Sequence, residues 1–246
     1  MAERTFGIST RLFRDAPLSR EHLVHIAAHG FTAVELYDTP PHFNRDHPQA
    51  VADLAEWLSD TRLTLHSVHA SGETADAARA SLTIASQLPF AFLVMHRPSA
   101  NTERALQATT DAAAAANVKV ALEVKGDPGS TPDALVRLIE EELEDIDVGI
   151  CLDFGRAHLL GDLIEAIETV SGHLWTTHVH DNGGRKNDHL VPYAGSIDWD
   201  TAMMATQKIG YDGVFMLEVA GSGDPVDVLT RAVKARERLE KAFVVF

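Results

Sequence analysis

The feature that most constrains the fold is a regular alternation of short apolar runs with amphipathic stretches. Eight apolar runs are predicted to be β-strands: 5–9, 33–37, 64–69, 92–96, 119–124, 147–154, 174–179 and 213–219. Eight stretches with the apolar spacing of helices alternate with them: 19–29, 47–60, 73–88, 101–116, 131–143, 160–171, 198–209 and 225–242. Strict alternation predicts a parallel sheet with right-handed crossovers. Eight such units in 246 residues predict an α/β fold that closes into a single (β/α)8 barrel.

Local signals agree with these helix bounds. Thr131-Pro132 and Asp224-Pro225 each place an N-cap residue before a proline, which is favoured at the first helical position. The competing fold is an open doubly wound sheet, but no GxGxxG motif follows the first strand. Because no low-complexity segment divides the chain, residues 1–246 are predicted to form one barrel domain.

Composition and charge narrow the range of partners. Apolar residues make up 45% and charged residues 23% of the chain, and no apolar run approaches the roughly 20 residues that span a bilayer. The net charge of -15 repels nucleic acid and anionic membranes, so neither is expected as a partner. The N-terminus has no apolar h-region and the single Cys151 cannot form an internal disulfide, so a cytoplasmic location is expected. A homo-oligomer stays open, since no interface can be recognised in the sequence.

Side chains that bind metals or move protons stand at or near the ends of the predicted strands. In chain order they are Glu35, His66, His69, His96, Glu123, Asp153, His178, His180 and Glu218. The active site of a (β/α)8 barrel lies at the carboxyl ends of its strands, so the carboxylates and imidazoles of strands five to eight converge there. Such groups repel one another or stay partly protonated unless a cation is present. Mixed oxygen and nitrogen ligands suit manganese, zinc, cobalt or iron(II), so these strand ends predict a divalent metal site.

Four segments resemble the xylose isomerase-like barrels, which include sugar isomerases and epimerases and the apurinic endonucleases related to endonuclease IV. They are ALEVK around Glu123, CLDFGRAH around Asp153, HVHDN followed by DHLVPYAGSIDW, and MLEVAG around Glu218. The resemblance covers nearly the whole chain and implies a xylose isomerase-like TIM barrel. It implies metal ligands at Glu123, Asp153, His178 and Glu218, because the family pattern His-x-x-Asp selects His178 over His180.

The resemblance also implies a set of side chains that contact substrate. His69, His96 and His189 match positions that hold extra metals in the endonuclease branch and tend to bind sugar in the epimerase branch. Glu35 is expected near the barrel mouth. Arg156 departs from the family, which usually has histidine three residues after the strand-six aspartate. A guanidinium cannot ligate a metal but can grip a phosphate or carboxylate, so Arg156 is expected to bind substrate.

These residues together predict a reaction. We expect a metal-dependent isomerase or epimerase that moves a proton beside the carbonyl of a sugar or sugar phosphate, through a metal-stabilised enediolate. Glu123 and Glu218, on strands five and eight, are the predicted acid–base pair. The predicted cofactor is one divalent ion of manganese, zinc, cobalt or magnesium, and the predicted partner is a small carbohydrate.

Other functions stay open on the sequence alone. An endonuclease IV-like phosphodiesterase would need several metals and a path for DNA, and the acidic charge and Arg156 argue against it. Related carbonyl chemistry, such as dehydration or hydroxypyruvate isomerisation, would use the same kind of site. The altered strand-six motif also allows a barrel that has lost turnover and acts as a non-catalytic binding protein.

Overall fold

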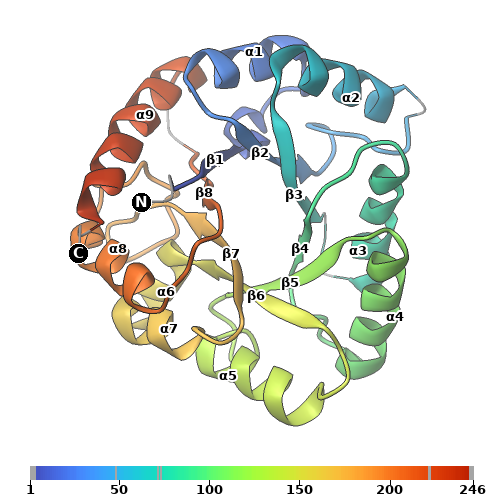
Figure 1. The fold of residues 1–246 in the computed structure, drawn as a ribbon, viewed down its shortest axis with the longest axis vertical. Coiled ribbons are helices and arrows are strands. Elements are labelled where there is room, and N and C mark those ends of the chain that lie inside the picture. Colours follow the sequence, from blue (N-terminus) through green and yellow to red (C-terminus); the bar gives the residue numbers. More distant parts are fainter. Residues whose placement is uncertain (1–3, 48, 71, 73, 221–222, 244–246) are drawn as a thin grey trace.

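Eight parallel strands close into a barrel in the order in which they follow one another along the chain. The computed structural model describes residues 4–47, 49–70, 72, 74–220 and 223–243. The last strand pairs with the first, with Phe6 beside Phe215 and Ile8 beside Leu217. Figure 1 shows the ring of strands with the helices arranged around its outside. The predicted (β/α)8 fold is therefore confirmed.

The elements follow the predicted alternation. The strands are β1 Phe6–Ser9, β2 Ala33–Asp38, β3 Thr64–Ala70, β4 Phe92–Met95, β5 Lys119–Glu123, β6 Val148–Asp153, β7 Leu174–Val179 and β8 Phe215–Leu217. The α-helices are α1 Arg20–Ala28, α2 Ala50–Thr61, α3 Ala75–Ser81, α4 Thr102–Ala115, α5 Pro132–Arg137, α6 Phe154–Leu160, α7 Leu163–Thr169, α8 Trp199–Lys208 and α9 Pro225–Ala242. Three shorter helical segments are η1 Thr10–Phe13, η2 Leu82–Ser86 and η3 Leu138–Glu142. Within the described ranges, no helix has the length and apolar character to cross a membrane.

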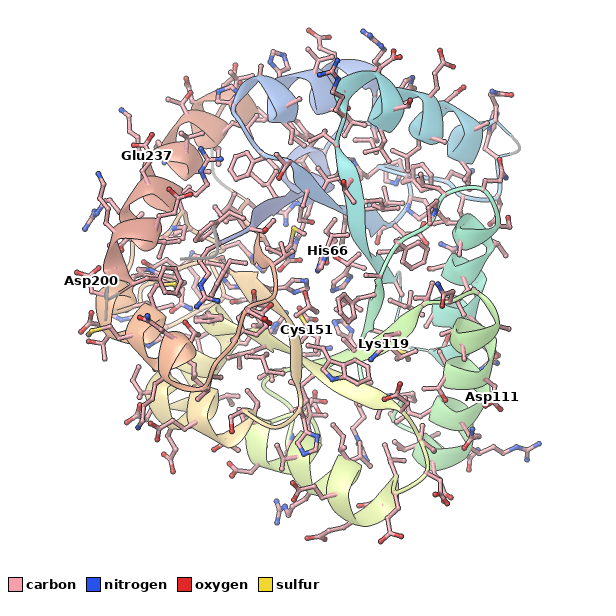
Figure 2. All side chains as sticks on the ribbon, in the orientation of Figure 1. His66, Asp111, Lys119, Cys151, Asp200 and Glu237 are labelled. Carbon is pink, nitrogen blue, oxygen red and sulfur yellow. The ribbon has the colours of Figure 1, made fainter. Side chains whose placement is uncertain are left out.

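Both faces of the strands are buried. One face packs against the surrounding helices, and the other lines the barrel interior. Val120 and Leu122 of β5 belong to the main core between barrel and helices. Side chains alternate along a strand, so Ala121 and Glu123 face the barrel interior. There Ala121 packs with Val94 and Cys151 in a small separate apolar cluster. Figure 2 shows Cys151 inside the ring, whereas Asp111 and Glu237 lie on the outer helices. The inner face thus changes from apolar to charged within one strand.

The structure corrects four predicted elements. The strand expected over 147–154 ends at Asp153, whose side chain caps a helix, α6, that begins at Phe154. The helix predicted over 160–171 corresponds to α7, whereas α6, which precedes it and ends before Gly161, was not predicted. The helices predicted over 73–88 and 131–143 each change their hydrogen-bond pattern part-way, into η2 and η3.

Candidate active site

His178 lies between two carboxylates at the carboxyl end of β7. Its Nδ1 is 2.8 Å from Glu123 Oε1, and its Nε2 is 3.0 Å from Glu35 Oε2. With a proton on each nitrogen the ring donates to both carboxylates. Burial disfavours the charged ring, but Cys151 and the carboxylates of Glu35 and Glu218 outweigh burial and raise the pKa of His178 well above its usual value. Glu35, expected near the mouth, is in fact fully buried in the middle of β2.

Glu123 is surrounded by imidazoles. Its Oε2 lies 2.8 Å from His96 Nε2 and 3.4 Å from His69 Nε2, while its Oε1 meets His178. Burial opposes ionisation of this carboxyl group, but hydrogen bonds from His178 and His69 outweigh burial and hold the pKa of Glu123 well below its usual value. Glu123 is therefore a carboxylate in the folded protein. His69 and His96, predicted to contact substrate, both lie at this cluster.

Asp153 lies beside a different histidine. Its Oδ1 accepts a hydrogen bond from the backbone N–H of Arg156 and lies 2.8 Å from His180 Nε2. The guanidinium of Arg156 turns back on the same carboxylate, with Nε 3.3 Å from Oδ2. The ring of His180 packs directly over the backbone of Gly155. Within residues 153–156, the Asp153 carboxylate thus lies between the guanidinium of Arg156 and the imidazole of His180.

Glu218 follows β8 and meets a guanidinium that the sequence did not reveal. Arg11 Nη1 lies 2.9 Å from Glu218 Oε1, and Glu218 Oε2 lies 3.3 Å from His189 Nδ1 and 3.8 Å from His178 Nδ1. Burial opposes ionisation of Glu218, but His178, Arg11 and His189 outweigh burial and lower its pKa. The only signal for Arg11 was its position directly after the first predicted strand.

Three of the four predicted metal ligands meet in one group. The ligand atoms of Glu123, His178 and Glu218, together with His69, all lie within 4.8 Å of one another, and all four residues are buried. Asp153, the fourth predicted ligand, lies against His180 and Arg156 as described above. Its role, like that of the other predicted site residues, stays a prediction.

The donors of this group fit a divalent cation. A metal-binding histidine usually donates its second ring N–H to a carboxylate, and Glu35 accepts that bond from His178 Nε2. His178 Nδ1 then faces Glu123 and Glu218. Glu218 Oε2 and Asp153 Oδ2 are buried without a hydrogen-bond partner. Buried carboxylate oxygens are costly to leave unpaired, so a cation bound by Glu218 would satisfy its Oε2.

Comparison with known proteins decides the family. The sequence model of the xylose isomerase-like TIM barrel matches residues 23–242, most of the chain. The chain belongs to the xylose isomerase-like TIM barrel family. A curated relative, the uncharacterized protein MJ1311 of Methanocaldococcus jannaschii, is 28% identical over 131 residues, which cover 50% of this chain and 42% of that protein.

Solved structures of this family share the fold along the full chain. The crystal structure of a D-tagatose 3-epimerase-like protein superposes with a TM-score of 0.78 at 23% identity, covering 97% of this chain and 96% of that one. The IolI protein, solved with a zinc atom, superposes with a TM-score of 0.77 at 19% identity, covering 98% of this chain and 100% of that one. At these identities the likeness establishes the architecture.

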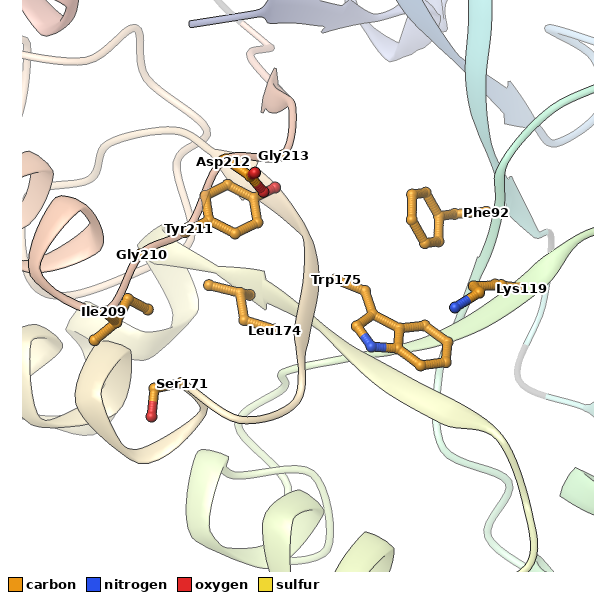
Figure 3. A pocket seen from close by; sticks show the side chains of 10 residues that line it. All are labelled: Phe92, Lys119, Ser171, Leu174, Trp175, Ile209, Gly210, Tyr211, Asp212 and Gly213. Carbon is orange, nitrogen blue, oxygen red and sulfur yellow. The ribbon is translucent and has the colours of Figure 1, made fainter. Parts of the chain in front are cut away.

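This xylose isomerase-like barrel also has a hollow at its other end. The cavity, of about 330 Å³, opens beside the indole of Trp175, over which Lys119 Nζ lies 4.5 Å from the ring centre (Figure 3). Its lining residues are Phe92, Lys119, Ser171, Leu174, Trp175, Ile209, Gly210, Tyr211, Asp212 and Gly213. Lys119 and Glu123 stand at the two ends of β5, so this cavity and the carboxylate cluster lie at opposite ends of the barrel.

The loop after β7 is anchored by one buried carboxylate. Asp181 accepts hydrogen bonds from Trp199 Nε1 at 2.8 Å and from the backbone N–H groups of Asn182, Gly195 and Ile197. The only sequence signal for this arrangement is the His-x-x-Asp pattern that ends at Asp181. The loop closed by Asp181 carries His189, so Asp181 positions one wall of the site.

Replacing Gly155 with alanine is expected to disturb the site through His180. A Cβ at residue 155 would lie 2.0 Å from His180 Cε1, so the imidazole must leave Asp153 or the backbone must shift. Overpacking of this kind costs about 1–3 kcal/mol of unfolding free energy, measurable by urea denaturation. Gly183→Ala is the matched control, because a Cβ there meets nothing within 4 Å. Equal stability of the two variants would contradict the packing described for His180.

Proposed function

We propose that this protein is a divalent-metal-dependent isomerase or epimerase of a sugar or sugar phosphate. The observation that carries the proposal is the convergence of two buried carboxylates on one nitrogen. Glu123 Oε1 and Glu218 Oε2 approach His178 Nδ1 to 2.8 and 3.8 Å from β5 and β8. The likeness to a D-tagatose 3-epimerase-like structure supports a sugar as the substrate class.

The residues that would hold the ion are Glu123, His178 and Glu218, with His69 or Asp153 completing the set. The ion would supply Lewis-acid stabilisation of the negative charge that develops when a proton leaves the carbon next to a carbonyl. The zinc atom of the IolI structure supports a divalent ion as the cofactor. Manganese, zinc, cobalt and magnesium are the ions to test.

In the proposed reaction Glu123 and Glu218 act on the substrate from opposite sides. Both are ionised in the folded protein, because their neighbours lower the pKa of each carboxyl group despite burial. Glu218 would accept the proton from carbon, and Glu123, after taking a proton from a neighbouring imidazolium such as His69, would return it to the opposite face, which inverts that centre in an epimerase. Positioned acid–base catalysis of this kind contributes about 10²–10⁴-fold to the rate.

Two of the side chains proposed to hold the substrate are partly exposed to solvent, and two are nearly buried. His96 and Arg156 have side chains that are 20% and 29% exposed, whereas His69 and His189 are nearly buried. Arg156 pairs through Nε with Asp153 and supplies the positive charge that a phosphate or carboxylate of the substrate would need. His189 and His69 form the walls beside Glu218 and Glu123.

Metal content and proton exchange test this proposal together. Protein dialysed against manganese and then against buffer should retain one ion per chain by elemental analysis. The same protein should exchange a carbon-bound proton of ketoses or ketose phosphates with deuterated water, followed by NMR. Absence of any ion after loading with each metal would contradict the metal site. A bound ion without exchange on any of these sugars would instead favour the non-catalytic binding protein.

The phosphodiesterase hypothesis has one specific observation in its favour. His69 and His96 both approach Glu123, so further metals have potential ligands on that side of the cluster. Several zinc ions per chain, with cleavage of abasic-site DNA, would support that function over the isomerase.

A further inference from the structure

We propose that Arg11 is a built-in cation that fills a second metal-ligand cluster beside the proposed metal site. The native chain then holds one divalent ion, and removal of the guanidinium opens the cluster to a second ion. The proposal deepens the proposed function and rests on it for the identity of the first ion, but its own evidence is a different set of residues.

The second cluster consists of His180, His189 and Glu218. Their ligand atoms lie within 4.8 Å of one another, and all three residues are buried. The rings of His180 and His189 stack with their centres 4.0 Å apart. Two imidazoles and a carboxylate that share one point form the donor set of a zinc or manganese site.

Unpartnered atoms point to a cation at this cluster. His180 is fully buried, and neither of its ring nitrogens makes a hydrogen bond, although Nε2 lies 2.8 Å from Asp153 Oδ1. Glu218 Oε2 and Asp153 Oδ2 are also buried without a hydrogen bond, although His189 Nδ1 and Arg156 Nε respectively lie 3.3 Å from them. These atoms need positive charge rather than a further hydrogen-bond donor alone.

Arg11 supplies that positive charge. Its Nη1 lies 2.9 Å from Glu218 Oε1 and 3.2 Å from His189 Nε2. His189 Nδ1 lies 2.9 Å from the carbonyl oxygen of Glu218, so Nδ1 carries the proton, and the lone pair of Nε2 faces both Arg11 Nη1 and Asn187 Nδ2, which lies 2.9 Å away. A lone pair and a carboxylate oxygen directed at one guanidinium are the same groups that would ligate an ion. Two cations cannot occupy one position, so Arg11 excludes the ion.

The position of Arg11 is fixed by its surroundings. Its backbone N–H donates to Ser9 Oγ at the start of η1, and its guanidinium carbon lies 5.4 Å from the centre of the Tyr37 ring. The side chain is 18% exposed, so it crosses a mostly buried path to Glu218. A long side chain held at its base, along its stem and at its tip stays in place when substrate enters and leaves.

Counting ions in Arg11→Met and in the native chain tests the proposal. Each protein is loaded with zinc, dialysed, and measured by elemental analysis, and the sites are then titrated calorimetrically in the metal-stripped proteins. The expected change is from one ion per chain in the native protein to two in Arg11→Met. Arg11→Lys, which keeps a positive charge, should still bind one. Arg11→Met combined with His180→Ala should return to one, because the second cluster then lacks a ligand.

Each outcome separates this inference from the proposed function. If the native chain and Arg11→Met bind the same number of ions, whether none, one or two, the inference is overturned. If both bind one ion, the proposed metal site nevertheless stands. No ion in the native chain and one in Arg11→Met contradicts the proposed site but supports Arg11 as the excluding cation. Circular dichroism and urea unfolding of Arg11→Lys and Arg11→Met establish that both are folded before the ions are counted.

Discussion

Replacing Glu218 with glutamine is expected to lower kcat for proton exchange on the substrate sugar by about 10²–10⁴-fold. The amide keeps the shape of the side chain but cannot accept a proton from carbon, and it is a weaker ligand than a carboxylate. Glu218 also joins both ligand clusters, so the variant should hold its divalent ion more weakly. Rates come from deuterium exchange followed by NMR, and ion affinity from calorimetric titration.

Two variants control for this result. Glu56→Gln removes an exposed carboxylate on α2 and should leave rate and affinity unchanged. Glu123→Gln removes the other proposed acid–base group and should reduce kcat by a similar factor, because the reaction needs both carboxylates. A Glu218→Gln protein that exchanges protons within threefold of the native rate would rule out Glu218 as the base.

Replacing Asp181 with alanine is expected to lower the free energy of unfolding by about 3–5 kcal/mol. The substitution leaves the indole N–H of Trp199 and three backbone N–H groups without their acceptor in a buried region. Trp199 itself is 1% exposed, so water does not readily replace the lost bond. The midpoint of urea denaturation, with an unchanged slope, measures the loss.

Asp198 offers a matched comparison in the same loop. It is an exposed carboxylate that caps α8 by accepting from the backbone N–H of Thr201. Loss of such an N-cap costs about 1 kcal/mol, so Asp198→Ala should be far milder than Asp181→Ala. If the two variants lose equal stability, the buried hydrogen bonds of Asp181 do not anchor the loop in the way described.

The barrel could be predicted because each strand and helix carries its own periodic pattern. The prediction for β7, over 174–179, agrees with the observed strand. The helix α6 was missed because it has only seven residues, too few for a period of 3.6 to repeat twice. Its start depends instead on a cap from Asp153, a residue that the sequence already suggested as a metal ligand.

The candidate site was only partly predictable, for a similar reason. Position at a strand end identified Glu123 and Glu218, since topology alone brings such residues together. It could not reveal that His180 approaches Asp153, or that Arg11 reaches Glu218. Those contacts depend on side-chain direction and on the packing of loops, which no local pattern in the sequence records.

The contact between Arg11 and Glu218 joins residues that are 207 positions apart in the chain. Arg11 is the second residue after β1 and Glu218 directly follows β8, the two strands that meet to close the ring. The site therefore cannot exist on a partly synthesised chain, and it is completed only when the last strand docks. Any ion bound there stabilises the closed ring over forms in which β8 has detached, because it binds only the former. Formation of the carboxylate cluster and completion of the barrel are one event in this molecule.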